Sequence, residues 1–277
     1  MTEQLQEVRA VSSRNRRARW ARWAALAVAL GVVALFFLRP PWALAAKTNL
    51  VGYAICHQLP SHSFHLGERQ LPLCARCTGI YLAAFGTFLG LATQRRRAGY
   101  MPPPTVLALL LGFVAVMAFD GANSYVASFF PAWLHLYEPR NWLRLATGLL
   151  AGTSLAIIVT PIFHATVWRE PEEVSVLPNA RSLLPWLVLA GVLVPVVSAE
   201  IPVLFYPLAI ASTLGVLMLL SAANTVLAAV FLRVENRAER WRETALPVLV
   251  GVGLAFLEIS AMDAFRAWLT TALGLPF

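Results

Sequence analysis

Residues 77–94 read CTGIYLAAFGTFLGLATQ, and the next three residues are Arg95, Arg96 and Arg97. The run carries no charged residue, and as an α-helix it would be about 27 Å long, close to the ~30 Å hydrocarbon core of a bilayer. A basic cluster directly after an apolar run is typical of the cytoplasmic end of a transmembrane helix. The stretch therefore predicts a membrane-spanning helix that ends on the cytoplasmic side.

Other apolar runs of similar or greater length occur along the chain. The sequence is 58% hydrophobic and only 13% charged. A single water-soluble globule of 277 residues could not bury that much apolar surface. We expect an all-α fold, a polytopic transmembrane helix bundle of about seven spans. The run 205–232 is overlong and contains Pro207, so a broken helix or an interfacial segment is the alternative there. The further runs are 23–38, 104–120, 142–163, 183–199, 205–232 and 245–263.

The basic residues are distributed unequally over the two sides of such a bundle. If each run crosses once, fifteen of the 22 Lys and Arg residues fall on the side of the N-terminus and seven on the other. This excess predicts that the N-terminus is inside and the C-terminus outside, in a multi-pass protein of the cell (inner) membrane. The net charge of +8 then reflects topology, so we expect the lipid bilayer as a partner and no nucleic acid.

This topology divides the chain into three parts. Residues 1–22 form a basic cytoplasmic tail, which we expect to be disordered. Residues 23–163 form a four-helix transmembrane core, and its outer segment, residues 50–81, contains a dense group of Cys and His residues. Residues 164–277 add three further spans. The first run also fits a secretory signal, although the long basic start and Pro40-Pro41 disfavour its cleavage.

All three cysteines, Cys56, Cys74 and Cys77, lie in this outer segment. Cys74 and Cys77 are spaced i and i+3 at the start of a predicted helix, so their thiols point the same way. The positive helix end and the intervening Arg76 favour the thiolate, the form that binds metal or attacks a disulfide. The spacing indicates reactivity without choosing a chemistry.

Three chemistries are compatible with these residues. Cys56, Cys74 and Cys77, with the adjacent His57 as the preferred fourth ligand, could bind Zn²⁺ or another thiolate-preferring ion such as Cu⁺ or iron. Cys74 and Cys77 could instead cycle as a redox pair, or a structural disulfide could join Cys77 to Cys74 or Cys56. His62 and His65 could be ligands or hydrated loop residues.

A second group of polar residues falls at the same outer level. Asp120 ends the third run, and Asn141 and Arg144 begin the fourth on one helical stripe. Because Arg144 lies so close to the hydrocarbon, its charge needs an anion as a partner. We expect Asp120 to be this anion, in a polar pocket, and the alternative is a lipid phosphate. Glu258 is a carboxyl group within the last predicted span. It could take part in an ion relay, or it could be capped or protonated and have no transport role.

The outer segment resembles a family of bacterial and archaeal predicted membrane proteins of unknown function. Cys56-His57-Gln58 and Cys74-Ala75-Arg76-Cys77-Thr78-Gly79 are its first signature, and Asp120-Gly121 and Asn141-x-x-Arg144 resemble later ones. The resemblance covers about residues 50–150 and implies no activity. That family has Arg directly before its Ser-Phe pair, where this chain has His62, which weakens a ligand role for His62.

Three functions follow as hypotheses. The first is a membrane protein with an extracytoplasmic metal site, Zn²⁺ being the preferred ion, and an activity that the sequence does not reveal. The second is a membrane thiol oxidoreductase that uses Cys74 and Cys77 with a quinone or a periplasmic partner, although known enzymes of that kind use two cysteine pairs. The third is a small-solute transporter or an accessory subunit of a membrane complex.

Overall fold

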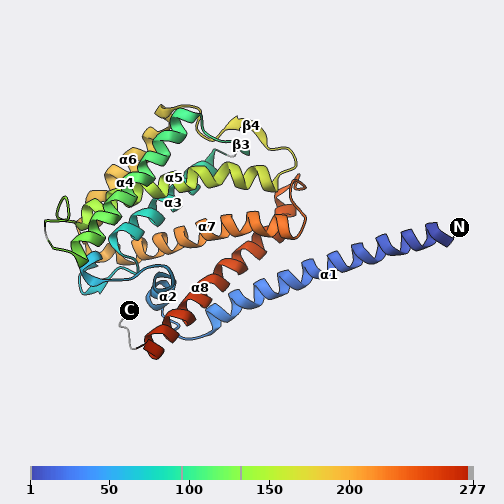
Figure 1. The fold of residues 1–277 in the computed structure, drawn as a ribbon, viewed down its shortest axis with the longest axis horizontal. Coiled ribbons are helices and arrows are strands. Elements are labelled where there is room, and N and C mark those ends of the chain that lie inside the picture. Colours follow the sequence, from blue (N-terminus) through green and yellow to red (C-terminus); the bar gives the residue numbers. More distant parts are fainter. Residues whose placement is uncertain (1, 95, 132, 274–277) are drawn as a thin grey trace.

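The computed structural model describes residues 2–94, 96–131 and 133–273, and these are mainly helical (Figure 1). Seven helical stretches are long and apolar enough to cross a membrane. This confirms the fold class, while the orientation of the bundle stays a prediction. The helices are α1 (Thr2–Leu38), α2 (Leu44–Ile55), α3 (Ala75–Thr93), α4 (Pro104–Phe129), α5 (Asn141–Val167), α6 (Leu184–Ser198), α7 (Phe205–Phe231) and α8 (Ala245–Leu273). The strands are β1 (His65–Leu66), β2 (Arg69–Gln70), β3 (Ala98–Tyr100) and β4 (Glu172–Ser175), and the 3₁₀ turns cover Pro60–His62, Ala180–Leu183, Pro202–Leu204 and Trp241–Thr244.

The structure differs from the sequence-based expectations at the basic tail and at α2, and at 205–232 it agrees with the expected span and not with the broken alternative. The basic tail is helical from Thr2 and continues without a break into the first span, whereas we expected disorder. The run 205–232 is one continuous helix, α7, because Pro207 lies in its first turn, where a missing N–H costs no helical hydrogen bond. A short helix that we did not predict, α2, fills the start of the outer segment.

The centre of the bundle is the close crossing of α3 and α5. A Cβ on Gly148 would lie 2.3 Å from the carbonyl oxygen of Arg76, and one on Gly152 would lie 1.9 Å from that of Ile80. From α3, a Cβ on Gly79 would meet the carbonyl oxygen of Leu145 at 2.4 Å. Small residues on both helices therefore allow the two backbones to touch, and this contact fixes how α3 is rotated.

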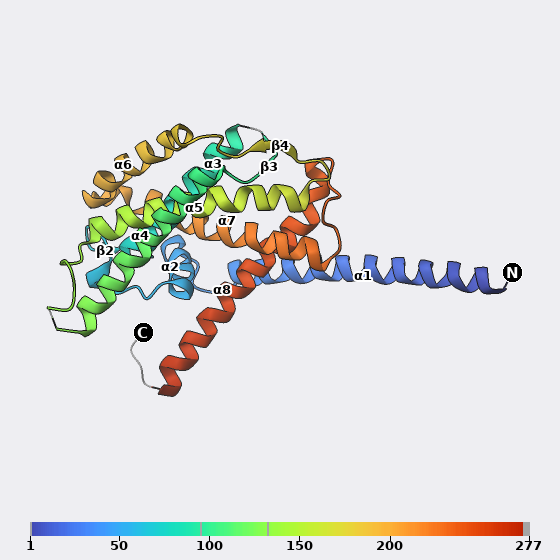
Figure 2. The same cartoon turned by 45° about the horizontal axis from the view of Figure 1, so that its top comes forward.

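The short helix α2 packs against α7 and α8 at the end of the bundle opposite the arginine-rich loops (Figure 1, Figure 2). Its Lys47 is buried and caps the end of α1: Nζ donates to the carbonyl oxygens of Phe36 and, at 2.7 Å, Arg39. A cation on the final carbonyls of a helix satisfies groups that have no partner inside the helix. α1 itself packs along α8, and its N-terminal half extends beyond the other helices (Figure 1).

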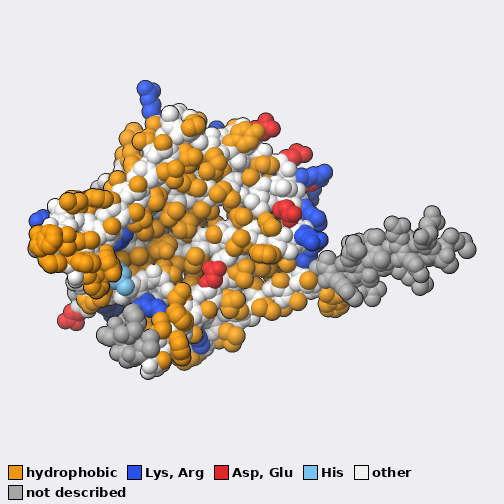
Figure 3. Space-filling view, in the orientation of Figure 1, with side chains coloured by type: hydrophobic (Ala, Val, Ile, Leu, Met, Phe, Trp, Pro, Cys, Tyr) orange, Lys and Arg blue, Asp and Glu red, His pale blue; other side chains and the backbone are white. Residues whose placement is uncertain are grey.

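The loops that follow α3, α5 and α7 meet at the arginine-rich end. β3 and β4 pair in parallel, with Ala98 opposite Glu172, and Arg169 bonds to Glu239 at 2.5 Å. Figure 3 shows basic side chains gathered at this end and mostly apolar side chains along the flank of the helices. An apolar belt with a basic rim is the surface expected of a protein in a bilayer.

Candidate functional site

The three cysteines come together at the end of the bundle opposite the arginine-rich loops. Cys56 directly follows α2, Cys74 is the N-cap residue of α3, and Cys77 lies in the first turn of α3. Their Sγ atoms all lie within 4.8 Å of one another, and Cys56 and Cys74 are buried. The backbone N–H of Cys74 donates to Cys56 Sγ at 3.2 Å. The predicted convergence of the sulfurs is thereby confirmed.

Gln58 holds the segment after Cys56 against the turn before Cys74. It has a left-handed backbone conformation, with φ of 51°, and its Nε2 donates to the carbonyl oxygens of Pro72 at 2.7 Å and Asn49 at 3.2 Å. Gln70 Nε2 in turn donates to the carbonyl oxygen of Gln58 at 2.8 Å. These amides replace the backbone pairing that an irregular loop lacks, and so they fix the position of Cys56.

A residue that the sequence analysis did not single out, Arg266 of α8, caps the end of α2. Its Nη1 donates to the carbonyl oxygens of Tyr53 and, at 2.6 Å, Cys56, and its guanidinium lies 4.0 Å from the centroid of the Tyr53 ring. The only signal in the sequence was a cation at the expected outer end of the last span. Because α2 was not predicted, no partner for this cation could be assigned.

The cysteine group favours one thiolate. Hydrogen bonds from the Cys74 and Cys77 thiols, followed in importance by backbone N–H groups, lower the pKa of Cys56 far below that of a free thiol. Because the Cys74 thiol donates its proton to Cys56 in this hydrogen bond, the pKa of Cys74 is raised. A negative sulfur next to two S–H groups is an arrangement that a soft cation can enter by displacing protons.

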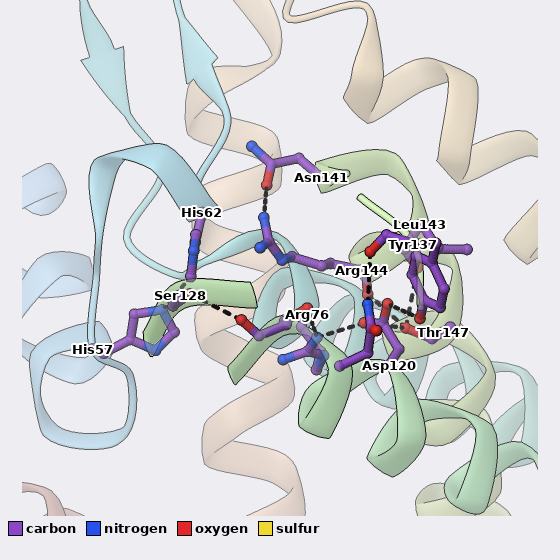
Figure 4. A network of polar contacts seen from close by, with 12 residues as sticks. His57, His62, Arg76, Asp120, Ser128, Tyr137, Asn141, Leu143, Arg144 and Thr147 are labelled. Atoms are coloured by element: carbon purple, nitrogen blue, oxygen red, sulfur yellow. Dashed lines mark hydrogen bonds and ion pairs between the residues drawn. The ribbon is translucent and has the colours of Figure 1, made fainter. Parts of the chain in front are cut away.

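The histidines lie outside the three-sulfur group. His57 is exposed, and its Nε2 lies 3.3 Å from Nδ1 of His62 (Figure 4). Burial, and next the positive charge of Arg144, lowers the pKa of His62 to about 4, so its ring is neutral at physiological pH. The backbone N–H of His65 donates to Glu200 at 3.2 Å. The structure thus brings together Cys56, Cys74 and Cys77 but not the expected fourth ligand, His57.

The predicted pairing of Asp120 with Arg144 is wrong. Asp120, which is 1% exposed, forms its ion pair with Arg76 of α3 instead. Its carboxylate also accepts a hydrogen bond from the Tyr137 hydroxyl at 2.9 Å and one from Thr147 Oγ1 at 3.5 Å (Figure 4). The rotation of α3 that the glycine contacts impose directs Arg76 toward α4, and the spacing of charges along the sequence does not encode that rotation.

Arg144 and Asn141 do interact, as neighbours on the same stripe of α5. Arg144 Nη1 donates to Asn141 Oδ1 at 2.8 Å, and Asn141 Nδ2 donates to the carbonyl oxygens of Ser61 and Ser63, each at 3.3 Å. Asn141 therefore links Arg144 to the loop that carries His62. Asp120 reaches this pocket through Thr147, one turn beyond Arg144.

The remaining candidate, Glu258, lies on an exposed face of α8 and accepts a 2.9 Å hydrogen bond from Asn224 Nδ2 of α7. This agrees with the alternative of a capped carboxyl. A separate apolar cavity of about 440 Å³ lies at the arginine-rich end, where Arg96 and His164 contribute to its lining. Neither feature contacts the cysteine group.

Comparisons with known proteins centre on the same region. The profile of a family described as "Predicted membrane protein (DUF2085)" matches residues 56–158, which include all three cysteines, Asp120 and Arg144. An uncharacterised protein of Methanothermobacter thermautotrophicus is 36% identical over 110 residues, covering 40% of this chain and 88% of the relative. An uncharacterised protein of Methanocaldococcus jannaschii is 29% identical over 147 residues, covering 48% and 86%. No solved structure matches the chain.

Proposed function

This chain belongs to the DUF2085 family of membrane proteins, and we propose that it binds one thiolate-preferring metal ion, Zn²⁺ above all, through Cys56, Cys74 and Cys77 on the outer side of the membrane. The observation that carries the proposal is the mutual approach of the three sulfurs to within 4.8 Å. In a tetrahedral zinc site with Zn–S bonds of about 2.3 Å, sulfurs lie about 3.8 Å apart. The group therefore needs only small side-chain adjustments to enclose such an ion.

The fourth coordination position belongs either to His57 or to a small exogenous ligand. His57 follows Cys56 directly, but it would have to leave its contact with His62 to reach the ion. A site with three protein ligands and one exchangeable position is typical of catalytic zinc, whereas a site closed by a fourth side chain is typical of structural zinc. If His57 is the fourth ligand, the metal would only join α2 to α3. If the fourth position is left to an exogenous ligand, the metal centre can be reactive.

Elemental analysis of protein purified under reducing, chelator-free conditions tests the metal proposal. We expect about one zinc per chain in the native protein and none in the triple variant Cys56→Ser, Cys74→Ser, Cys77→Ser. His65→Gln, in the same segment but bonded through its backbone, is the matched control and should keep the metal. Native protein without stoichiometric metal would contradict the proposal. His57→Gln then asks whether the imidazole contributes to affinity.

A thiol oxidoreductase is the second candidate, and the observation that favours it is the approach of the three thiol sulfurs to within 4.8 Å of one another. In that reaction two thiols form a disulfide and release two protons and two electrons, which reduce a quinone to the quinol. Alkylation of the free thiols before and after addition of a quinone distinguishes the candidates. A redox enzyme loses two alkylation sites on oxidation, whereas a metal site is protected until a chelator removes the ion.

A further inference from the structure

Arg144 is a buried cation with few acceptors around it. The residue is 5% exposed, and with the described residues its side chain forms one hydrogen bond, from Nη1 to Asn141 Oδ1 at 2.8 Å. Its Nε is buried and has no acceptor in the part of the chain that the structure describes. A guanidinium has five N–H donors, and a buried charged donor without an acceptor costs free energy. Such a group requires an anion or ordered polar molecules beside it.

The nearby carboxylate does not fill this need. Asp120 already receives Arg76, Tyr137 and Thr147 on its two oxygens, and Arg76 also donates to Ser124 at 3.1 Å. The carboxylate thus pairs with Arg76, and among the described residues it forms no ion pair with Arg144. Arg76 Nε is likewise buried, and no described residue supplies it with an acceptor. The unmatched charge lies on the Arg144 side, because Arg76 is the residue in ion-pair contact with Asp120.

The Arg144 guanidinium faces the loop that opens to solvent. Figure 4 shows it between Asn141 and His62, on the side of Arg76 away from Asp120. His57 and Ser61 of that loop are exposed, and His62 is half-buried. The neutral His62 ring, at the edge of this loop, can donate one hydrogen bond to an anion beside Arg144.

We propose that Arg144, flanked by Asn141 and His62, binds an oxyanion, either a sulfate-like or phosphate-like solute or a lipid phosphate at the membrane surface. The planar fork of an arginine matches two oxygens of such an anion, and these charge-assisted hydrogen bonds are among the strongest in proteins. The site uses no cysteine. It is therefore independent of the proposed metal site and goes beyond it.

Sulfate binding to the full chain in a phosphate-free neutral detergent tests this proposal. Sulfate is titrated at constant ionic strength against chloride, and the midpoint of thermal unfolding is recorded. Native protein should show a saturable stabilisation, and Arg144→Gln should weaken the apparent affinity at least about tenfold, since charge-assisted bonds are lost. Arg69→Gln is the matched control: Arg69 is exposed on the same face and donates to Tyr206 at 2.9 Å. This variant should bind sulfate as the native protein does.

Two further arms cover misfolding and the source of the anion. Arg144→Lys keeps the charge, and with it the folded state, but loses the fork, so it should bind sulfate more weakly than native protein and show no loss of folded yield. Short-chain phosphatidylglycerol that competes with sulfate identifies a lipid headgroup as a ligand, whereas sulfate binding unaffected by this lipid identifies a soluble anion. No saturable response to either ligand, or equal affinity in native protein and both Arg144 variants, overturns the proposal. The triple Cys→Ser variant should still bind sulfate, which separates this outcome from the fate of the metal site.

Discussion

Gln58 Nε2 lies 2.7 Å from the carbonyl oxygen of Pro72, and this hydrogen bond joins the segment after Cys56 to the turn before Cys74. Gln58→Ala removes it and leaves Cys56 held mainly by α2. Residues that orient metal ligands typically contribute about 10–100-fold to metal affinity, so we expect a loss of that order. Competition with a chromophoric zinc chelator measures it. Leu59→Ala, at an exposed neighbouring position, should leave the affinity unchanged, and an equal affinity in both variants would exclude this role for Gln58.

The α3–α5 crossing should not tolerate a methyl group. Gly152→Ala places a Cβ 1.9 Å from a backbone carbonyl oxygen, and neither helix can move without disturbing Cys74 and Cys77 at the start of α3. We expect a loss of roughly 1–3 kcal/mol in the free energy of unfolding, measured by denaturant titration in mixed micelles. Gly112→Ala is the control, because no atom of a described residue lies within 4 Å of its added Cβ. Similar stabilities for the two variants would argue against the close crossing.

The Arg76–Asp120 pair predicts a specific energetic coupling. Asp120→Asn leaves Arg76 without its buried counter-ion, and breaking such pairs typically costs about 3–5 kcal/mol. A double-mutant cycle with Arg76→Met should give a coupling free energy of about 1–3 kcal/mol, as expected for residues in contact. The same cycle with Arg144→Met in place of Arg76→Met should give a clearly smaller value. A larger coupling free energy with Arg144 than with Arg76 would instead support the Asp120–Arg144 pair that we first expected from the sequence.

His62 should make the folded state sensitive to acid. Its folded-state pKa of about 4 is below the ordinary 6.5, so the unfolded chain binds the proton more readily between these values. Stability is fully present above about pH 6.5 and decreases as the pH falls toward 4. The charges that act on the ring are those of Arg144, His57 and Arg76, which lower its pKa, and that of Cys56, which raises it. His62→Gln should flatten this part of the unfolding profile, recorded by thermal denaturation from pH 7 to 4; an unchanged slope would assign the acid sensitivity to another group.

The helical spans could be predicted because their signal is local. An apolar run such as residues 77–94 encodes its own length and its basic end, and no tertiary information is needed to recognise it. The convergence of the sulfurs was also accessible, since Cys74 and Cys77 share one helix start and Cys56 is only 18 residues before Cys74. The metal and the fourth ligand stay predictions.

The polar contacts were harder to predict because they depend on rotation and on non-local helices. Asp120 and Arg144 were placed at the same depth, yet depth does not specify which face of α3 is directed toward α4. That rotation follows from backbone contacts at Gly79, Gly148 and Gly152. The short helix α2 lacks the length of a span and was assigned to a loop, so its cap, Arg266, could not be found.

The cap on α2 also has a consequence for biosynthesis. Arg266 donates to the carbonyl oxygen of Cys56 across 210 positions of sequence, so this contact forms only after α8 has left the ribosome. Until α8 packs against α2, the end of α2 and the carbonyl group of Cys56 lack that cap. The packing of α8 against α2 is thereby the step that completes the support of the segment around Cys56.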